Sequence, residues 1–227
     1  MKICRNFAKG GVAVKQQYDN GMMTRRAIVE AGKELYYQKG FHATSYHDLC
    51  EMAHIDRSTF YYHFRSKEVL RYEVEWEFLT WDKRIAEKYC MDARYHYLVA
   101  MAMIWQQCGF DAKLRRFQRE CCVDFPVFTG KRDASYFYFT ASKALWGAFL
   151  DWKSLPTLAF ATNYGYLISC LLMLCDHPET YEPWELFSHC VRCCCMILGM
   201  PEAQIAEILR NIKTYLDTIP EEELHSF

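Results

Sequence analysis

The sequence predicts an all-α fold, and three observations lead to this prediction. Apolar residues recur at spacings of three and four along most of the chain after residue 22, which is the period of an amphipathic helix. No segment of comparable length alternates between apolar and polar residues, as a half-buried strand would. With 227 residues, of which 52% are apolar and 24% charged, the chain can bury a substantial core, and this excludes a disordered protein.

The first predicted helix is marked by an apolar stripe and a glycine stop, which are Ile28, Ala31, Leu35 and Gly40. Residues 1–21 precede it and are polar, punctuated by glycine and without an apolar period. We therefore expect residues 1–21 to form a flexible basic arm, or to lie upstream of a start at Met22 or Met23.

Two short helices follow, each with its own N-cap signal. Ser45 can accept a backbone hydrogen bond at the start of the first, and Asp48 is placed to complete a capping box. Asp56 is the candidate cap of the second. The apolar positions of the two helices are Tyr46, Leu49, Cys50 and Ala53, then Phe60 and Phe64. Two short helices joined by a tight turn form a helix-turn-helix.

Longer helices fill the rest of the chain. Their apolar stripes are Leu70, Val74, Phe78, Trp81 and Ile85; Leu98, Met101, Trp105 and Cys108; Leu114, Phe117 and Cys121, ended by Pro126; and Tyr138, Ala141, Leu145, Phe149 and Trp152. An uncharged stretch ending at Cys175 forms a further helix, and Pro183 and Pro201 open the last two. We expect a three-helix domain over residues 22–68, a helical domain over residues 69–227, and about nine or ten helices in all.

The net charge of −1 hides a difference between two parts of the chain. Residues 1–70 carry eleven Lys and Arg against seven Asp and Glu, or +4, whereas the remaining residues carry 16 against 21, or −5. Such an asymmetry points to a partner for one part. Residues 22–70 alone carry seven against six, so most of the excess lies in residues 1–21.

Cysteine content and apolar run length predict the compartment. The chain has 12 cysteines, but its N-terminus lacks the apolar region of a secretory signal, so we expect free thiols in a reducing cytoplasm. The longest uncharged run lies between Lys153 and Asp176 and is interrupted by polar residues, so its continuous apolar part is too short to span a bilayer. We expect a cytoplasmic protein without a membrane segment.

The helix-turn-helix carries a series of short motifs: Lys39-Gly40-Phe41, Thr44-Ser45, the stripe from Leu49 to Ala53, Thr59-Phe60-Tyr61-Tyr62-His63-Phe64, and Ser66-Lys67-Glu68. Together, over residues 24–70, they resemble the DNA-binding segment of the TetR family of transcriptional regulators. The sequence departs from the family pattern at Cys50, Ser58 and His54, the last in place of the usual turn glycine. A histidine held at positive φ costs about 1–2 kcal/mol.

The N-terminal end of the third helix supplies the candidate base contacts. A helix in the major groove reads bases with short donors and acceptors at this end, where Arg57, Ser58 and Thr59 lie. Arg57 is the candidate for a bidentate contact to guanine. The candidates for contacts to the DNA backbone are Thr44, Ser45, Tyr61, Tyr62, His63 and Lys67. Each also has an ordinary alternative, such as packing for Tyr61 or simple exposure for His63 and Lys67.

The resemblance implies a homodimer on a palindromic operator in double-stranded DNA. Its two recognition helices would lie roughly 34–36 Å apart, one turn of DNA. The apolar stripes of 183–199 and 201–219 are the candidates for the dimer contact, so we expect a homodimer through residues 183–219. The alternative is that these stripes close the core of the single chain.

The resemblance also implies a repressor that a small, largely apolar or aromatic ligand releases from DNA. The candidate ligand pocket in the second domain contains aromatic, thioether and charged side chains, which are Met101, Trp105, Tyr138, Lys143, Trp146 and Phe149. Such residues are individually more often core than pocket. We expect no cofactor and no enzyme activity, because the sequence has no glycine-rich phosphate loop, HExxH pair or GxSxG elbow.

Cys190 and Cys194 share one helix face and suggest a different regulator. In a dimer they would give four thiolates, a possible thiol-redox or metal site. Free cysteine is more often a small buried apolar residue, so we predict no metal. A helical interaction module without DNA binding is the alternative from another functional class.

Overall fold

The structure is a computed structural model that describes residues 7–124, 143–150 and 157–224. The chain divides into two compact units, with the boundary between Val74 and Glu75. All regular elements in the described ranges are helical, as predicted. None of these helices combines the length and the apolar character needed to cross a membrane.

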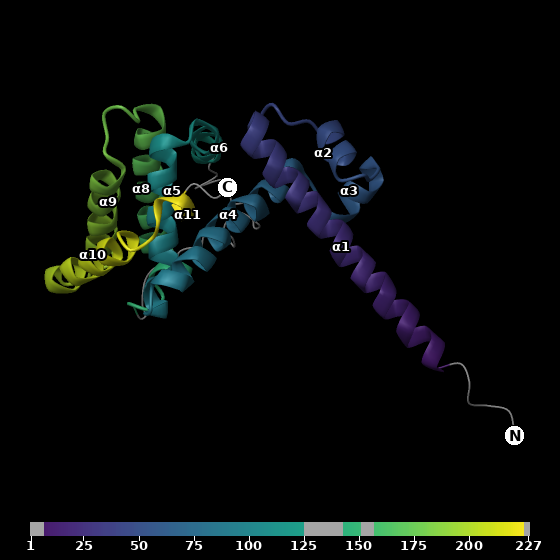
Figure 1. Cartoon of the computed structure of the whole chain (residues 1–227), viewed down its shortest axis with the longest axis horizontal. Coiled ribbons are helices and arrows are strands. Elements are labelled where there is room, and N and C mark those ends of the chain that lie inside the picture. Colours follow the sequence, from purple (N-terminus) through teal and green to yellow (C-terminus); the bar gives the residue numbers. More distant parts are fainter. Residues whose placement is uncertain (1–6, 125–142, 151–156, 225–227) are drawn as a thin grey trace, which may run out of the picture. The chain divides into compact units, whose positions relative to one another are not determined.

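The N-terminal unit contains α1 (Phe7–Lys39), α2 (Tyr46–Met52), α3 (Arg57–His63) and the start of α4 (Lys67–Tyr89) (Figure 1). The helices α2 and α3 have seven residues each, too few to be stable in isolation, so packing must hold them. Their core is apolar and includes Ile28, Leu35, Leu49, Phe60, Phe64 and Leu70, all buried.

Helix α1 begins earlier than predicted. The structure makes residues 7–21 helical and continuous with the predicted first helix, where we expected a flexible arm. Extending a formed helix avoids the cost of nucleation, so a polar stretch without an apolar stripe can continue it. The predicted stop is correct, because Gly40 has φ +90° directly after the last helical residue.

The boundary between the units lies inside α4 and later than the predicted boundary at residue 68. The first turns of α4 pack on α1 at Gly32, where a Cβ would lie 3.1 Å from Leu70 and 3.2 Å from Val74. This close approach makes the beginning of α4 part of the N-terminal unit.

The C-terminal unit contains the rest of α4 and a series of longer helices. They are η1 (Ala93–Tyr95), α5 (His96–Phe110), α6 (Ala112–Val123), α8 (Thr157–Asp176), α9 (Pro183–Ile197), α10 (Glu202–Leu216) and the short α11 (Glu221–Leu224). Helix α5 packs against α6, α8, α9 and α10, and α8 and α9 lie side by side (Figure 1). The predicted helix over 138–152 lies largely outside the described residues, of which 143–146 are helical.

Buried aromatic side chains form the core of the C-terminal unit. Trp105 on α5 is fully buried, and its ring meets that of Phe187 on α9 at 5.4 Å between centroids. Phe78 on α4 and Phe117 on α6 make a similar contact at 5.4 Å. Burial of large rings, more than helix ends, therefore holds this unit together.

Candidate nucleic-acid interface

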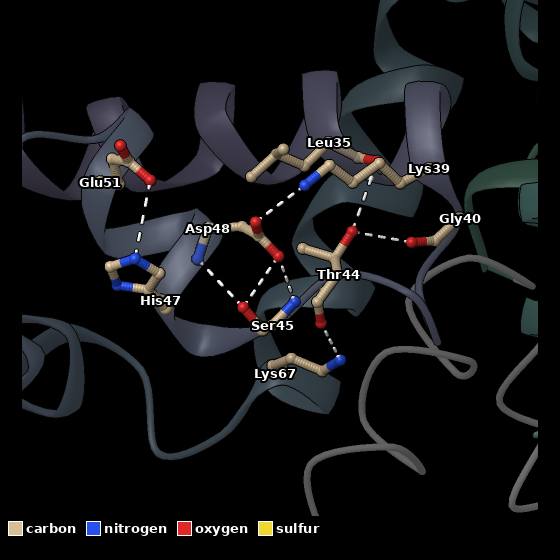
Figure 2. A network of polar contacts seen from close by, with 9 residues as sticks. All are labelled: Leu35, Lys39, Gly40, Thr44, Ser45, His47, Asp48, Glu51 and Lys67. Carbon is tan, nitrogen blue, oxygen red and sulfur yellow. Dashed lines mark hydrogen bonds and ion pairs between the residues drawn. The ribbon is translucent and has the colours of Figure 1, made fainter.

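The start of α2 is fixed by the capping box that the sequence predicted. The Asp48 N–H donates to Ser45 Oγ (3.1 Å), and Ser45 N donates to Asp48 Oδ2 (2.8 Å) (Figure 2). Lys39, at the end of α1, donates to Asp48 Oδ1 (2.7 Å). This lysine, together with Ser45, lowers the pKa of Asp48 well below its ordinary value. The network ties the end of α1 to the first turn of α2.

Thr44 lies inside the turn before α2. Its side chain is fully buried, and its hydroxyl donates to the Gly40 carbonyl oxygen (2.7 Å) (Figure 2). A buried hydroxyl that already donates to the backbone does not face a phosphate. Among the predicted contacts at this end of α2, the exposed residue is Ser45, and Thr44 shapes the turn that presents it.

Lys67, at the start of α4, also has partners within the N-terminal unit. Its ammonium donates to the Phe41 carbonyl oxygen (3.0 Å) and to the Thr44 carbonyl oxygen, and it lies 4.7 Å from the centre of the Phe41 ring. Its backbone N–H donates to the Tyr46 hydroxyl (3.1 Å). Lys67 therefore stabilises the turn between α1 and α2. Its distance in sequence from this turn gave no indication of that role.

The turn between α2 and α3 is a Schellman helix stop with an unusual residue. His54 has φ +53°, its N–H donates to the Glu51 carbonyl oxygen (3.2 Å), and the N–H of Ile55 donates to that of Cys50 (2.9 Å). Glycine normally occupies this position, because the left-handed region is costly for residues with a Cβ. The strain predicted from the missing glycine is therefore present.

The first turn of α3 is held by Asp56, as predicted. Its Oδ1 accepts from the Ser58 hydroxyl (2.6 Å) and the Thr59 N–H (2.7 Å). These hydrogen bonds, the one from Ser58 first, lower the pKa of Asp56 to about 2. The carboxylate is therefore ionised at neutral pH, and the Ser58 hydroxyl is engaged with it.

Arg57 is exposed and rests on two tyrosine rings. Its guanidinium carbon lies 5.2 Å from the ring centre of Tyr46 and 5.6 Å from that of Tyr61, and it donates to the Tyr61 hydroxyl (3.2 Å). Cation–π contacts of this kind restrict a flexible side chain. The arrangement holds the guanidinium at the exposed N-terminal end of α3.

The remaining predicted contacts lie along α3. Tyr62 is 85% exposed and Tyr61 44% exposed, and the Tyr61 hydroxyl accepts the hydrogen bond from Arg57. His63 is half-buried, and its pKa is lowered by burial and by the nearby Arg25 charge, so its ring is neutral at pH 7. A neutral ring can donate one N–H to a phosphate but adds no positive charge.

Two supports of α3 were not found from the sequence. The Tyr46 ring packs edge-on against Phe60 at 5.3 Å, which makes it the platform for Arg57 as well as part of the core. Arg25 on α1 pairs with Glu73 on α4, and its guanidinium lies 4.5 Å from the centre of the Phe64 ring. These partners are far apart in sequence, so residue spacing gives no signal for them.

The predicted ligand-pocket residues lie in different environments. Met101, Trp105 and Trp146 are buried, Phe149 is partly exposed and lies 5.2 Å from the Tyr95 ring, and Lys143 is exposed. Tyr138 lies outside the described residues. The buried members belong to the apolar core of the C-terminal unit, and the pocket stays a prediction.

The cysteines of α9 are mostly interior. Cys190 and Cys194 are buried, at 1% and 0% exposure, as a small apolar residue would be. Across the described ranges, no group of three His, Cys, Asp or Glu side chains has an arrangement suited to a metal ion.

Residues 28–74 match the family described as bacterial regulatory proteins, tetR family. The HTH-type transcriptional regulator UidR of Escherichia coli strain K12 is 40% identical over 47 residues, which cover 21% of this chain and only 24% of UidR.

Among solved structures, the chain is similar to TylP, a tetR regulator from Streptomyces fradiae, with 14% identity and a TM-score of 0.49 over 87% of this chain and 93% of that one. It is also similar to the TetR family protein CprB from S. coelicolor A3(2), with 15% identity and a TM-score of 0.42 over 88% of this chain and 99% of CprB. The family match ends at the boundary of the N-terminal unit, so the similarity to the tetR family of bacterial regulatory proteins is established for the helix-turn-helix segment of the chain.

Proposed function

We propose that this chain is a DNA-binding transcriptional regulator whose α3 reads bases in the major groove. The observation that carries this proposal is the exposed N-terminal end of α3, where Arg57 is held on Tyr46 and Tyr61. A guanidinium fixed in this way loses little conformational freedom on pairing with the O6 and N7 acceptors of guanine.

The remaining exposed groups suit contacts to the DNA backbone. Tyr62 presents its hydroxyl beyond α3, and Ser45 lies at the N-terminal end of α2. Phosphate contacts of this kind set the register of the protein without reading sequence. Because residues 22–70 carry a net charge of only +1, we expect weak binding to non-specific DNA.

A homodimer through residues 183–219 remains our proposal, but the surface for it differs from the predicted stripes. The stripe on α10, which includes Ile205, Ile208 and Ile212, is buried within the chain's own C-terminal unit. Met196 and Ile197 on α9 are 61% and 40% exposed and are available for a partner. A two-fold axis near these residues would pair two reading helices on a palindromic operator.

We further propose that the protein is a repressor released by a small apolar or aromatic ligand bound in the C-terminal unit. Its aromatic interior supports a ligand of this chemistry. To move most of the population off DNA, the ligand must favour the released state by about 5 kcal/mol. The mechanism is therefore a shift between two conformations.

Selection of binding sites from random duplex DNA with the full chain, followed by gel shift on the selected site, tests DNA binding. We expect Arg57→Ala to weaken binding to that site roughly ten- to hundredfold and to relax the preference at one base pair. Arg26→Ala removes the same charge from an exposed site on α1 and should change affinity less than about twofold. Failure of the unmodified chain to retard any duplex at low salt would contradict the proposal.

A further inference from the structure

Tyr46, the first residue of α2, contacts both α3 and the start of α4. Its hydroxyl accepts a hydrogen bond from the backbone N–H of Lys67, the first residue of α4 (3.1 Å). Its ring packs edge-on against Phe60 on α3, with 5.3 Å between the ring centroids. The guanidinium carbon of Arg57, the first residue of α3, lies 5.2 Å from the centre of the same ring. One side chain therefore connects the beginning of α4 to the beginning of α3.

The hydrogen bond from Lys67 fixes the outer end of the Tyr46 side chain. The first N–H groups of a helix have no acceptor within the helix, so the N–H of Lys67 takes its partner from elsewhere. The Tyr46 hydroxyl supplies that acceptor from 21 residues away in the sequence. Lys67 is itself held, because its ammonium donates to the Thr44 carbonyl oxygen, as Figure 2 shows, and to that of Phe41. The tyrosine hydroxyl is thus bound to a fixed point of the N-terminal unit.

Arg57 depends on its surroundings for its direction, because its side chain is long and flexible. One of its supports, Tyr61, lies four residues further along α3 and therefore fixes the guanidinium only relative to that helix. The other support, Tyr46, lies outside α3. A tyrosine has only two rotatable side-chain bonds, so contacts at its hydroxyl and at its ring edge leave the ring face little freedom. Tyr46 therefore fixes Arg57 relative to α2 and α4 as well.

We propose that Tyr46 is a positioning residue for base recognition, which uses its hydrogen bond from the start of α4 to direct the Arg57 guanidinium toward one base pair. The inference rests on the proposed function and deepens it, because the specificity of Arg57 then depends on a residue that need not contact DNA. A guanidinium without this support can turn to nearby phosphates, which carry no sequence information. Loss of Tyr46 should therefore reduce base preference more than overall affinity.

The test compares binding of the full-length protein to two duplexes by gel shift. One is the selected site, and the other has a different base pair at the position where Arg57→Ala relaxes the preference. We expect Tyr46→Leu to lower the preference between the two duplexes about three- to tenfold, because the arginine is no longer held before it binds. Affinity for the substituted duplex should change less than about twofold. Tyr46→Phe keeps the ring and loses only the hydroxyl, so it should lower the preference less than Tyr46→Leu does.

A double variant separates positioning from a general structural role. In the Arg57→Ala background, Tyr46→Leu should not change the base preference further, because the two residues act through one contact to DNA. Tyr36 offers a matched control. Its hydroxyl donates to the carbonyl oxygen of the same Lys67 (3.4 Å), but its buried ring packs against Phe41 at 5.4 Å between centroids. Tyr36→Phe should therefore leave the base preference unchanged.

Two measurements without DNA test the contacts themselves. In Tyr46→Phe, amide hydrogen exchange at Lys67 should become faster, because the N–H loses its acceptor. In Tyr46→Leu, the upfield shifts of the Arg57 side-chain NMR signals should become smaller, because one of the two ring faces is gone.

The outcomes for this inference and for the proposed function are distinct. A base preference that is retained in folded Tyr46→Leu, or lost equally in Tyr36→Phe, overturns the positioning role alone. Should Tyr46→Leu fail to fold by circular dichroism, Tyr46→Phe takes its place, and an unchanged base preference with unchanged Lys67 exchange then overturns the inference. Failure of the unmodified chain to bind any duplex overturns the proposed function and this inference with it.

Discussion

The two units of this protein differ in the contacts that fix their helices. In the N-terminal unit, the seven-residue helices α2 and α3 pack on an apolar core, and polar contacts through Ser45, Asp48 and Asp56 fix where they begin. In the C-terminal unit, helices of 12 to 20 residues are held mainly by buried rings such as those of Trp105 and Phe187. The helix-turn-helix of α2 and α3 (the reading head) therefore depends on capping contacts of modest strength as well as on packing, whereas the C-terminal unit depends mainly on packing.

One feature occurs in both units and differs in a single residue. Helix α9 ends in the same Schellman stop as α2, with Gly199 at φ +76° and hydrogen bonds from Gly199 N to Met196 O (3.0 Å) and from Met200 N to Cys195 O (3.0 Å). The corresponding residue in the N-terminal unit is His54. Glycine adopts a positive φ without strain, so Gly199 is unstrained, whereas His54 at the same position of its helix stop is strained.

The largest effect should come from removing a buried ring. We expect Trp105→Ala to lower the free energy of unfolding of the C-terminal unit by about 3–5 kcal/mol, because it leaves a large cavity next to Phe187. Urea unfolding followed by far-UV circular dichroism measures this. Met91→Ala, at a side chain 93% exposed, should change stability by less than about 0.5 kcal/mol. Similar losses for both variants would contradict the role of packing.

A smaller effect should follow from removing a cap in the reading head. Ser45→Ala deletes the oxygen that accepts from Asp48 N and should cost about 1 kcal/mol, because the first turn of α2 loses its side-chain acceptor. Hydrogen exchange of the α2 amides should increase while that of α8 stays unchanged. An equal increase in both helices would show that the cap does not act locally.

Exchanging the residues of the two helix stops should change the stability of the two units in opposite directions. His54→Gly should stabilise the N-terminal unit by about 0.5–1 kcal/mol, since relief of left-handed strain exceeds the added flexibility of the unfolded chain. Gly199→His should destabilise the C-terminal unit by a similar or larger amount. Thermal melts of both variants measure the two changes in stability. His54→Ala is the control, because alanine also has a Cβ and so keeps the left-handed strain. A loss of stability in His54→Gly would mean that the imidazole itself holds the turn.

The smallest expected effect is a dependence of the stability of the N-terminal unit on acidic pH. The pKa of Asp56 is lowered from 3.8 to about 2 in the folded protein, so its contribution to stability is present above about pH 4 and is lost as pH falls through 2. Asp56→Asn can still cap α3 but does not titrate in this range. The melting temperature of the N-terminal unit should therefore fall less between pH 4 and 2 in the variant than in the unmodified chain. Equal falls in melting temperature for the variant and the unmodified chain would contradict a stabilising role for the ionised Asp56 carboxylate.

Much of the reading head could be predicted from the sequence because its interactions are local. The caps at Ser45 and Asp56 lie within three residues of the groups they bind, and the strain at His54 follows from a missing glycine. The burial of Thr44 and the contacts of Lys67 could not be predicted in this way. The ammonium of Lys67 donates to the Phe41 and Thr44 carbonyl oxygens, 26 and 23 residues away in the sequence, and residue spacing gives no signal for such contacts.

The all-α class, the helix-turn-helix and most helix ends could be predicted from the sequence, because periodicity and capping act over a few residues. Which apolar stripes face the chain's own interior depends on how distant helices pack, since the α10 stripe of Ile205, Ile208 and Ile212 has the same pattern whether a partner or the core covers it.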